Sequence, residues 1–160
     1  MTYTVDTPRS RRRFRWPRLP LGEGQAAWTT RALMLLAPLL SFTLVEYLNY
    51  NNPWTDFTSL QIALNLAWYY LGELFFYFVL RRRASAVKWA MGIAWGLGMA
   101  NHYLISFRGR TLFPGDFLTL RTAANVAGNY DYRPDSMQWL TIGVFAAVLL
   151  ALSFLPNEKK

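Results

Sequence analysis

The chain has 160 residues, of which 53% are hydrophobic and 17% aromatic, and its formal net charge is +8. This composition is too apolar for an ordinary soluble domain, and the 17 Lys and Arg residues stand in clusters instead of being spread along the chain. Because there is no cysteine, disulfides and thiol chemistry are excluded.

The first 31 residues form a basic segment. The run Ser10–Phe14 resembles a twin-arginine export signal, but the first apolar run begins well downstream of it and further apolar runs follow. We therefore interpret residues 1–31 as a cytosolic arm that is poorly ordered and lies near anionic lipid. Nucleic acid is not expected as a partner.

Apolar runs dominate the rest of the chain. A membrane crossing needs about 20 mostly apolar residues, and none of these runs alternates with the period of a strand. The sequence therefore predicts an all-α integral membrane domain over residues 32–155. Its four transmembrane helices are expected at residues 32–50, 60–80, 87–107 and 137–155.

The Lys and Arg clusters predict how these helices are oriented, because cytosolic loops are enriched in both residues. The basic arm before the first helix and the loop 81–88 are expected in the cytosol, whereas the loop 49–59 has neither Lys nor Arg and is expected outside. The insert 108–135 is then external, and the tail 156–160 is cytosolic. Arg108, Arg110, Arg121 and Arg133 in an external insert go against the rule. They are expected to bind an anionic group or to reach lipid phosphates.

Ionisable and polar residues within membrane helices are costly and are candidates for function. Glu46, Asn65 and Glu73 are the candidates in the first two helices. Asn65 is also explained by hydrogen bonding between helices, and Glu73 by pairing with a residue on another helix. The single His102 has no Cys or acid cluster to complete a metal site, and a hydrogen-bonded packing role is favoured.

The third apolar run carries small residues at a spacing of four, Gly92 and Gly96. Such a face allows another helix backbone to approach closely, and packing within the bundle is favoured over a dimer interface. The sequence shows no Ser-His-Asp set, no phosphate-binding glycine loop and no paired carboxylates. Neither a catalytic residue nor a cofactor is therefore expected in this chain.

The residues of the insert after the third helix predict a turn followed by a short helix. Pro114-Gly115 is typical of a turn, and Asp116 stands where the N-cap of a helix over 117–127 is expected. This helix is too short to cross a membrane, so it is predicted to lie in the outer interface. Arg108, Arg110, Asp116 and Arg121 are the candidates for contact with a lipid headgroup or a catalytic domain.

The amino-acid sequence of the insert resembles that of the N-terminal membrane domain of lipoteichoic acid synthase-like proteins. The residues that carry the resemblance are Arg108-Gly109, Phe113-Pro114-x-Asp116-Phe117, 122–127 and Tyr130, with Glu46-Tyr47 and Asn51-Asn52-Pro53 upstream. The family consists of sulfatase-superfamily phosphoglycerol transferases of the bacterial cell envelope. The resemblance implies five spans and an external catalytic domain that holds a divalent metal and a Thr nucleophile.

Residues 1–160 include neither a fifth span nor that catalytic domain. The chain is thus expected to be a truncated or stand-alone membrane-anchor and lipid-presenting portion, not catalytic alone, in a bacterial cell membrane. Its expected partners are the bilayer, an anionic phospholipid such as phosphatidylglycerol, and a sulfatase-like catalytic domain. The alternative is a small four-helix transporter, or an accessory subunit that docks a separate envelope enzyme, with Glu46, Asn65 and Glu73 along a path between the helices.

Overall fold

The computed structural model describes residues 22–119 and 133–154, and 86% of them lie in helices, 3-10 helix included. Strands are absent from these two ranges. The all-α prediction is therefore confirmed for the described part of the chain. In chain order the helices are α1 (Glu23–Leu48), α2 (Pro53–Asp56), α3 (Ser59–Leu80), α4 (Arg83–Arg108), the 3-10 helix η1 (Pro114–Thr119) and α6 (Ser136–Phe154).

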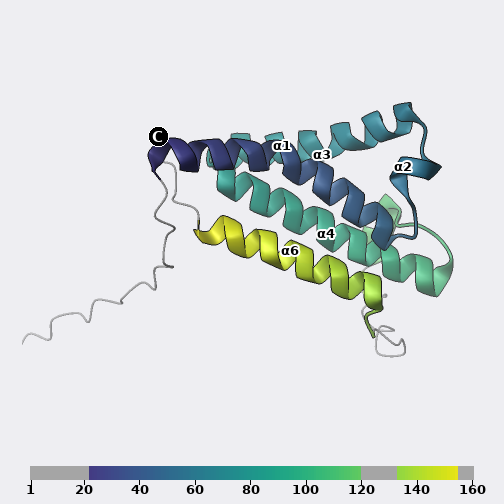
Figure 1. Ribbon diagram of the computed structural model, residues 1–160. Coiled ribbons are helices and arrows are strands. Elements are labelled where there is room, and N and C mark those ends of the chain that lie inside the picture. The colour runs from purple at the N-terminus through teal and green to yellow at the C-terminus, as the bar shows by residue number, and fades with distance from the viewer. Residues whose placement is uncertain (1–21, 120–132, 155–160) are drawn as a thin grey trace, which may run out of the picture.

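The long helices α1, α3, α4 and α6 lie side by side, and consecutive ones run in opposite directions (Figure 1). α4 packs along both α1 and α3, whereas α6 lies against α4 and α1. The start of α1 and the end of α6 are at one end of the bundle. α4 therefore has the most central position, and the segment that follows it begins at the opposite end.

Three of the described helices are long and apolar enough to cross a membrane: α1 over Gly24–Leu48, α3 and α6. α4 has 26 residues, the same length as α1, but it does not belong to this group. It carries Lys88, Asn101 and His102 in its interior, which lower its mean hydropathy. The three apolar helices indicate a membrane-embedded protein. The sequence predicts four transmembrane helices, one more than this count.

The surface of α3 has the polarity expected of a helix in lipid. Its buried residue is an acid, Glu73, whereas Trp68, Phe75 and Phe78 are 73%, 62% and 72% exposed. A water-soluble protein rarely exposes large apolar side chains in such a continuous patch while it buries a carboxyl group. The exposed apolar face of α3 is therefore compatible with contact to lipid chains.

Local capping sets the start and the end of α3. Thr58 and Gln61 form a reciprocal capping box, in which each side chain accepts a hydrogen bond from the other residue's backbone N–H. At the other end Arg81 has a φ of 52°, in the left-handed region, and its N–H donates to the Tyr77 carbonyl. The chain then reverses at once, because Arg83 already begins α4.

Two helix boundaries differ from those expected. α1 begins at Glu23, inside the predicted basic arm, and α4 begins at Arg83 instead of residue 87. Once a helix is nucleated, each further residue adds a backbone hydrogen bond, so a helix can extend beyond its apolar run. The prediction of a poorly ordered arm was wrong for residues 23–31, and residues 1–21 lie outside the described part of the chain.

The side chain of Val45 in α1 packs directly against the backbone of α4 at Gly98. A Cβ atom added at Gly98 would lie 2.9 Å from Cγ1 of Val45 in α1. A Cβ added at Gly92 or Gly96 would meet no described atom within 4 Å. The prediction of close packing within the bundle at Gly92 and Gly96 was therefore wrong. Gly98 is the glycine of α4 against which another helix packs closely.

The short helix in the insert after α4 also differs from the prediction. An α-helix over 117–127 with Asp116 as its N-cap was expected, but the structure has the 3-10 helix η1 over Pro114–Thr119. Asp116 lies inside η1, and residues 120–132, which held most of the expected helix, are outside the described part. The physical reason is that Pro114, with its fixed φ and missing N–H, suits the first position of a helix, so the helical turn begins there.

Candidate functional site

A bidentate ion pair holds the segment that follows α4. Arg110 Nη1 donates to Asp116 Oδ2 at 2.9 Å, and Nη2 donates to Oδ1 at 2.6 Å. The guanidinium carbon also lies 5.7 Å from the centre of the Phe113 ring. This planar match of guanidinium and carboxylate fixes both distance and orientation, so it closes the loop of residues 111–115 between the two partners.

Asp116 has a second role in the same turn, because its Oδ2 accepts the backbone N–H of Phe113 at 2.9 Å. The hydrogen bond from Arg110 is the main reason, and the bond from Phe113 the next, that the pKa of Asp116 is lowered to about 2. The carboxyl is therefore ionised throughout the physiological range. Asp116 acts from the third position of η1, reaching back over the helix start, and not as the N-cap that the sequence suggested.

The other candidate arginines differ from Arg110. Arg108 is exposed at the last position of α4, and no hydrogen bond or ion pair joins it to any residue in the described ranges. Gly109 then ends the helix with a φ of 64°. The charge of Arg108 also contributes to the low pKa of Asp116. Arg121 lies outside the described residues, so the structure does not place it.

Large apolar side chains are exposed next to these charges. Phe113, Phe117 and Leu118 are 56%, 50% and 89% exposed. An exposed stretch in which two arginines are followed by exposed Phe and Leu side chains is typical of the boundary of a bilayer, where apolar side chains meet lipid tails and guanidinium groups meet phosphates. We refer to residues 108–118 as the arginine segment.

Two asparagines join the arginine segment to the bundle. The N–H of Leu112 donates to Asn101 Oδ1 at 2.6 Å, and Asn101 Nδ2 donates to Asn49 Oδ1 at 2.9 Å. Asn49, at the end of α1, in turn donates to the Val45 carbonyl at 2.7 Å. The arginine segment is therefore positioned by α1 and α4 together and does not hang from α4 alone.

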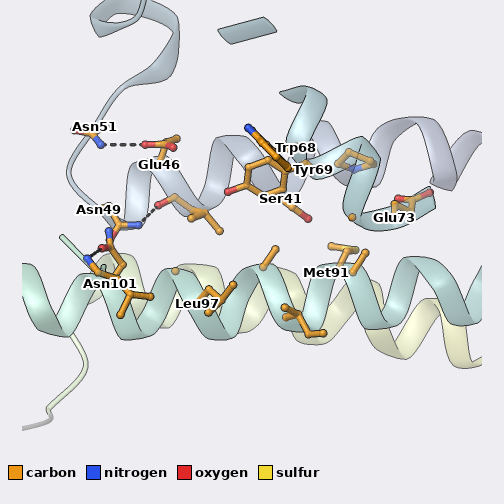
Figure 2. Close-up of a pocket in the computed structure, with 18 of the residues that line it drawn as sticks. Ser41, Glu46, Asn49, Asn51, Trp68, Tyr69, Glu73, Met91, Leu97 and Asn101 are labelled. Carbon is orange, nitrogen blue, oxygen red and sulfur yellow. Dashed lines mark hydrogen bonds between the residues drawn. The ribbon is translucent and has the colours of Figure 1, made fainter. Parts of the chain in front are cut away.

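A pocket of about 550 Å³ lies between α1, α3 and α4 (Figure 2). Thr111 and Leu112 of the arginine segment are among its lining residues. This volume is within the range of about 300–1,000 Å³ that is typical of small-molecule sites. On α4 the lining runs from Ala90 to Ile105, which is roughly 22 Å of helix at 1.5 Å per residue. The pocket is therefore long and narrow, and most of its walls are apolar.

The pocket brings together two of the three candidate residues within the helices. Glu46 and Glu73 both line it, and Glu46 Oε2 accepts a hydrogen bond from Asn51 Nδ2 at 3.0 Å (Figure 2). Glu73 is 3% exposed, and no hydrogen bond or ion pair links it to the described residues. Asn65 is not among the lining residues, so the pocket brings together Glu46 and Glu73 without it.

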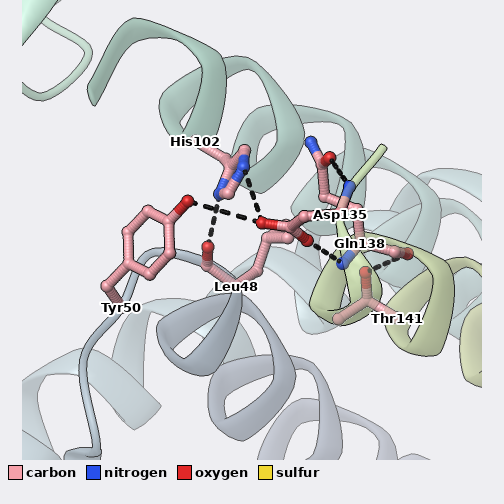
Figure 3. Close-up of polar contacts among 6 residues, drawn as sticks. All are labelled: Leu48, Tyr50, His102, Asp135, Gln138 and Thr141. Atoms are coloured by element: carbon pink, nitrogen blue, oxygen red, sulfur yellow. Dashed lines mark hydrogen bonds and ion pairs between the residues drawn. The ribbon is translucent and has the colours of Figure 1, made fainter. Parts of the chain in front are cut away.

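A second polar cluster lies where α1, α4 and α6 meet (Figure 3). His102 Nδ1 is 2.6 Å from the Leu48 carbonyl oxygen, and because a carbonyl only accepts, Nδ1 carries the hydrogen. His102 Nε2 lies 3.7 Å from Asp135 Oδ2, to which the Tyr50 hydroxyl donates at 3.4 Å. Asp135 Oδ1 accepts the N–H of Gln138 at 2.7 Å and so caps α6. The prediction of a hydrogen-bonded packing role for His102 is confirmed.

Comparison with other proteins does not assign a function to the arginine segment or to the pocket, and neither does metal-ligand geometry. No family model matches the chain, and no curated protein or solved structure matches it. No group of three or more His, Cys, Asp or Glu residues that could hold a metal occurs in the part that the structure describes. The role of the arginine segment and of the pocket must therefore come from their own geometry and charge.

Sequence reasoning overlooked Asn101 and Asp135 as contact residues. A signal for Asp135 was present, because Asp followed three positions later by Gln is a capping pattern, and Asp135 N–H donates to Gln138 Oε1 at 2.8 Å. Asn101 gave no comparable signal. Its two partners, Asn49 and Leu112, lie on different segments, and only the packing of α1 against α4 brings them together.

Proposed function

We propose that this chain is a membrane domain that holds an anionic phospholipid headgroup at its outer surface, for a phosphoglycerol transferase of the lipoteichoic acid synthase-like kind. The observation that carries the proposal is the arginine segment, in which Arg108 is exposed beside a turn that Arg110 and Asp116 keep in one conformation. The family itself enters through the resemblance of the sequence.

The proposal includes four membrane crossings with both ends in the cytosol. α4 is antiparallel to α3 and α6 and equals α1 in length, so it has the direction and the reach of a crossing helix (Figure 1). Its polar residues Asn101 and His102 have hydrogen-bond partners within the protein, at the C-terminal end of α1 and at Leu112. A helix whose polar groups are satisfied within the bundle can cross lipid at a lower mean hydropathy.

Within the arginine segment the two arginines have separate tasks. Arg110 is bound by Asp116 on both of its terminal nitrogens, so it fixes the turn. Arg108 has its full set of donors available to a ligand, and a guanidinium suits a phosphate because its planar fork can bind two oxygens. Phe113, Phe117 and Leu118 would dip into the lipid and keep Arg108 at phosphate level.

In this proposal the chain and the catalytic domain have different roles. The chain would bind and orient the lipid, and a sulfatase-like catalytic domain with its own divalent metal would transfer glycerol phosphate. That catalytic domain would contact the same outer surface, since the headgroup has to reach it there. Binding energy spent on orientation of this kind lowers the barrier of the transfer even though the residues that provide it do not react.

The test is lipid retention by the purified full chain. The protein is extracted from a membrane that contains phosphatidylglycerol and phosphatidylcholine in equal amounts, and both lipids are quantified. Arg108→Ala should lower the ratio of retained phosphatidylglycerol to phosphatidylcholine by about tenfold, the loss expected for a charge-assisted hydrogen-bonding group.

Arg82→Ala is the matched control, because Arg82 is also an exposed arginine at an end of α4 but at the other end of the bundle. It should retain the wild-type ratio. An unchanged ratio in Arg108→Ala, or an equal loss in both variants, would show that the lipid is held by unspecific charge and would refute the proposal.

A further inference from the structure

The pocket between α1, α3 and α4 has a charge character opposite to that of the arginine segment. Glu46 and Glu73 line it, and its lining residues include no Lys, Arg or His. A phosphate or carboxylate inside it would face carboxyl groups with no neutralising cation. The pocket therefore excludes the anionic headgroup that we propose for Arg108, and the ligand it accepts must be of another kind.

Two polar side chains of the pocket lack partners. Glu73 is 3% exposed and Ser41 2%, and the Ser41 hydroxyl oxygen has no hydrogen-bond partner. No hydrogen bond or ion pair joins Glu73 to the described residues. A buried polar group without a partner costs free energy that a ligand with a matching donor recovers. Both side chains can accept a hydrogen bond, so a ligand that donates would satisfy both.

Aromatic side chains line the pocket together with Glu73. Tyr69 lies four residues before Glu73 on α3 and Phe76 three residues after it, so both are about one turn away on the same side of the helix. Trp68 is a third aromatic lining residue (Figure 2). Aromatic faces attract cations, and the attraction is stronger where water is excluded. A carboxyl group flanked by aromatic rings in an apolar cavity favours an ammonium group over a neutral hydroxyl.

We propose that this pocket binds a lipophilic amine, with its ammonium group at Glu73 and its apolar body along α4. The long apolar wall from Ala90 to Ile105 accommodates an extended chain. Ser41 offers a further acceptor on the α1 side. This site is separate from the arginine segment, and its ligand need not be the lipid of the proposed function.

The experiment measures decylamine binding to the full chain in a non-ionic detergent by equilibrium dialysis, with 1-decanol as the uncharged ligand of the same chain length. Decylamine should bind wild-type protein at least tenfold more tightly than decanol does, and Glu73→Gln should remove that preference. Glu73→Gln keeps the size of the side chain, so the cavity itself remains.

Gly72→Leu gives a second, independent variant. Gly72 lines the pocket and a Cβ added there meets no described atom within 4 Å, so a leucine at this position places its side chain in space that the ligand would need. Gly143→Leu is its matched control, since a Cβ at Gly143 in α6 is equally unhindered and Gly143 does not line the pocket. Decylamine binding should be lost in Gly72→Leu and kept in Gly143→Leu.

Three results would overturn the inference. They are equal binding of decylamine and decanol by the wild type, unchanged decylamine affinity in Glu73→Gln, and unchanged affinity in Gly72→Leu. If Glu73→Gln does not fold, the comparison of Gly72→Leu with Gly143→Leu and the preference of the wild type for the amine decide the question. Phosphatidylglycerol retention by these variants reports separately on the arginine segment.

Discussion

The packing of α1 on α4 makes Gly98→Ala a sharp test of the bundle. The added methyl would lie 2.9 Å and 3.0 Å from the two Cγ atoms of Val45, and 3.4 Å from its Cβ. Carbon atoms at optimal separation are about 3.5–4.0 Å apart, so both Cγ contacts are repulsive. Val45 is 8% exposed and, as a β-branched residue in a helix, has one strongly preferred rotamer, so it cannot turn away.

The helices therefore have to separate, and overpacking of this kind costs about 1–3 kcal/mol. Gly98→Ala should lower the midpoint of thermal unfolding of the detergent-solubilised protein. Gly96→Ala is the matched control on the same helix, since its Cβ meets no described atom within 4 Å. It should be neutral or stabilising by up to about 1 kcal/mol, because alanine is a better helix former than glycine.

A double variant shows whether Val45 is the cause. Val45→Ala removes both Cγ atoms that the new methyl would meet, so adding it to Gly98→Ala should recover part of the lost stability. If Gly98→Ala unfolds at the same temperature as wild type, or if Gly96→Ala is destabilised to the same degree, α1 and α4 do not pack as described.

Two further predictions concern the arginine segment. In a carboxyl NMR titration Asp116 should have its midpoint at about 2, and in Arg110→Ala this midpoint should rise toward the ordinary Asp value. Because the pKa of Asp116 is lowered in the folded state, the stabilisation from its contact with Arg110 is present above the ordinary Asp pKa. It is lost as the pH falls through about 2. Asn101→Leu removes the partner of both Leu112 and Asn49, which should cost about 1–3 kcal/mol and speed hydrogen exchange at Leu112, whereas Gly96→Ala should leave that rate unchanged.

The helices could be predicted because their cause is local. Apolar runs locate α1, α3 and α6. The start of α3 has a capping pattern in the sequence, Thr58 followed three positions later by Gln61. Helix ends were less accurate, since an apolar run marks the part of a helix that lies in lipid and not the extent of its hydrogen bonding. α1 therefore starts at Glu23, well before its apolar run.

The site was predictable only where its partners are close in the chain. Arg110 and Asp116 lie on either side of a Pro-Gly turn, and the sequence already indicated both as candidate contact residues. Glu46 and Glu73 share a pocket because α1 and α3 are rotated in a particular way about their axes, and the same rotation excludes Asn65. Such rotation depends on packing, which helical periodicity alone does not determine.

Everything proposed for the arginine segment requires it to face the outside of the cell, and single-cysteine labelling measures this directly. The native chain has no cysteine, so Thr111→Cys gives a unique and exposed thiol beside Arg110. Ser85→Cys, near the start of α4, is the control for the opposite side. A membrane-impermeant maleimide should label Thr111→Cys in intact cells and Ser85→Cys only after permeabilisation, whereas the reverse pattern would contradict the account.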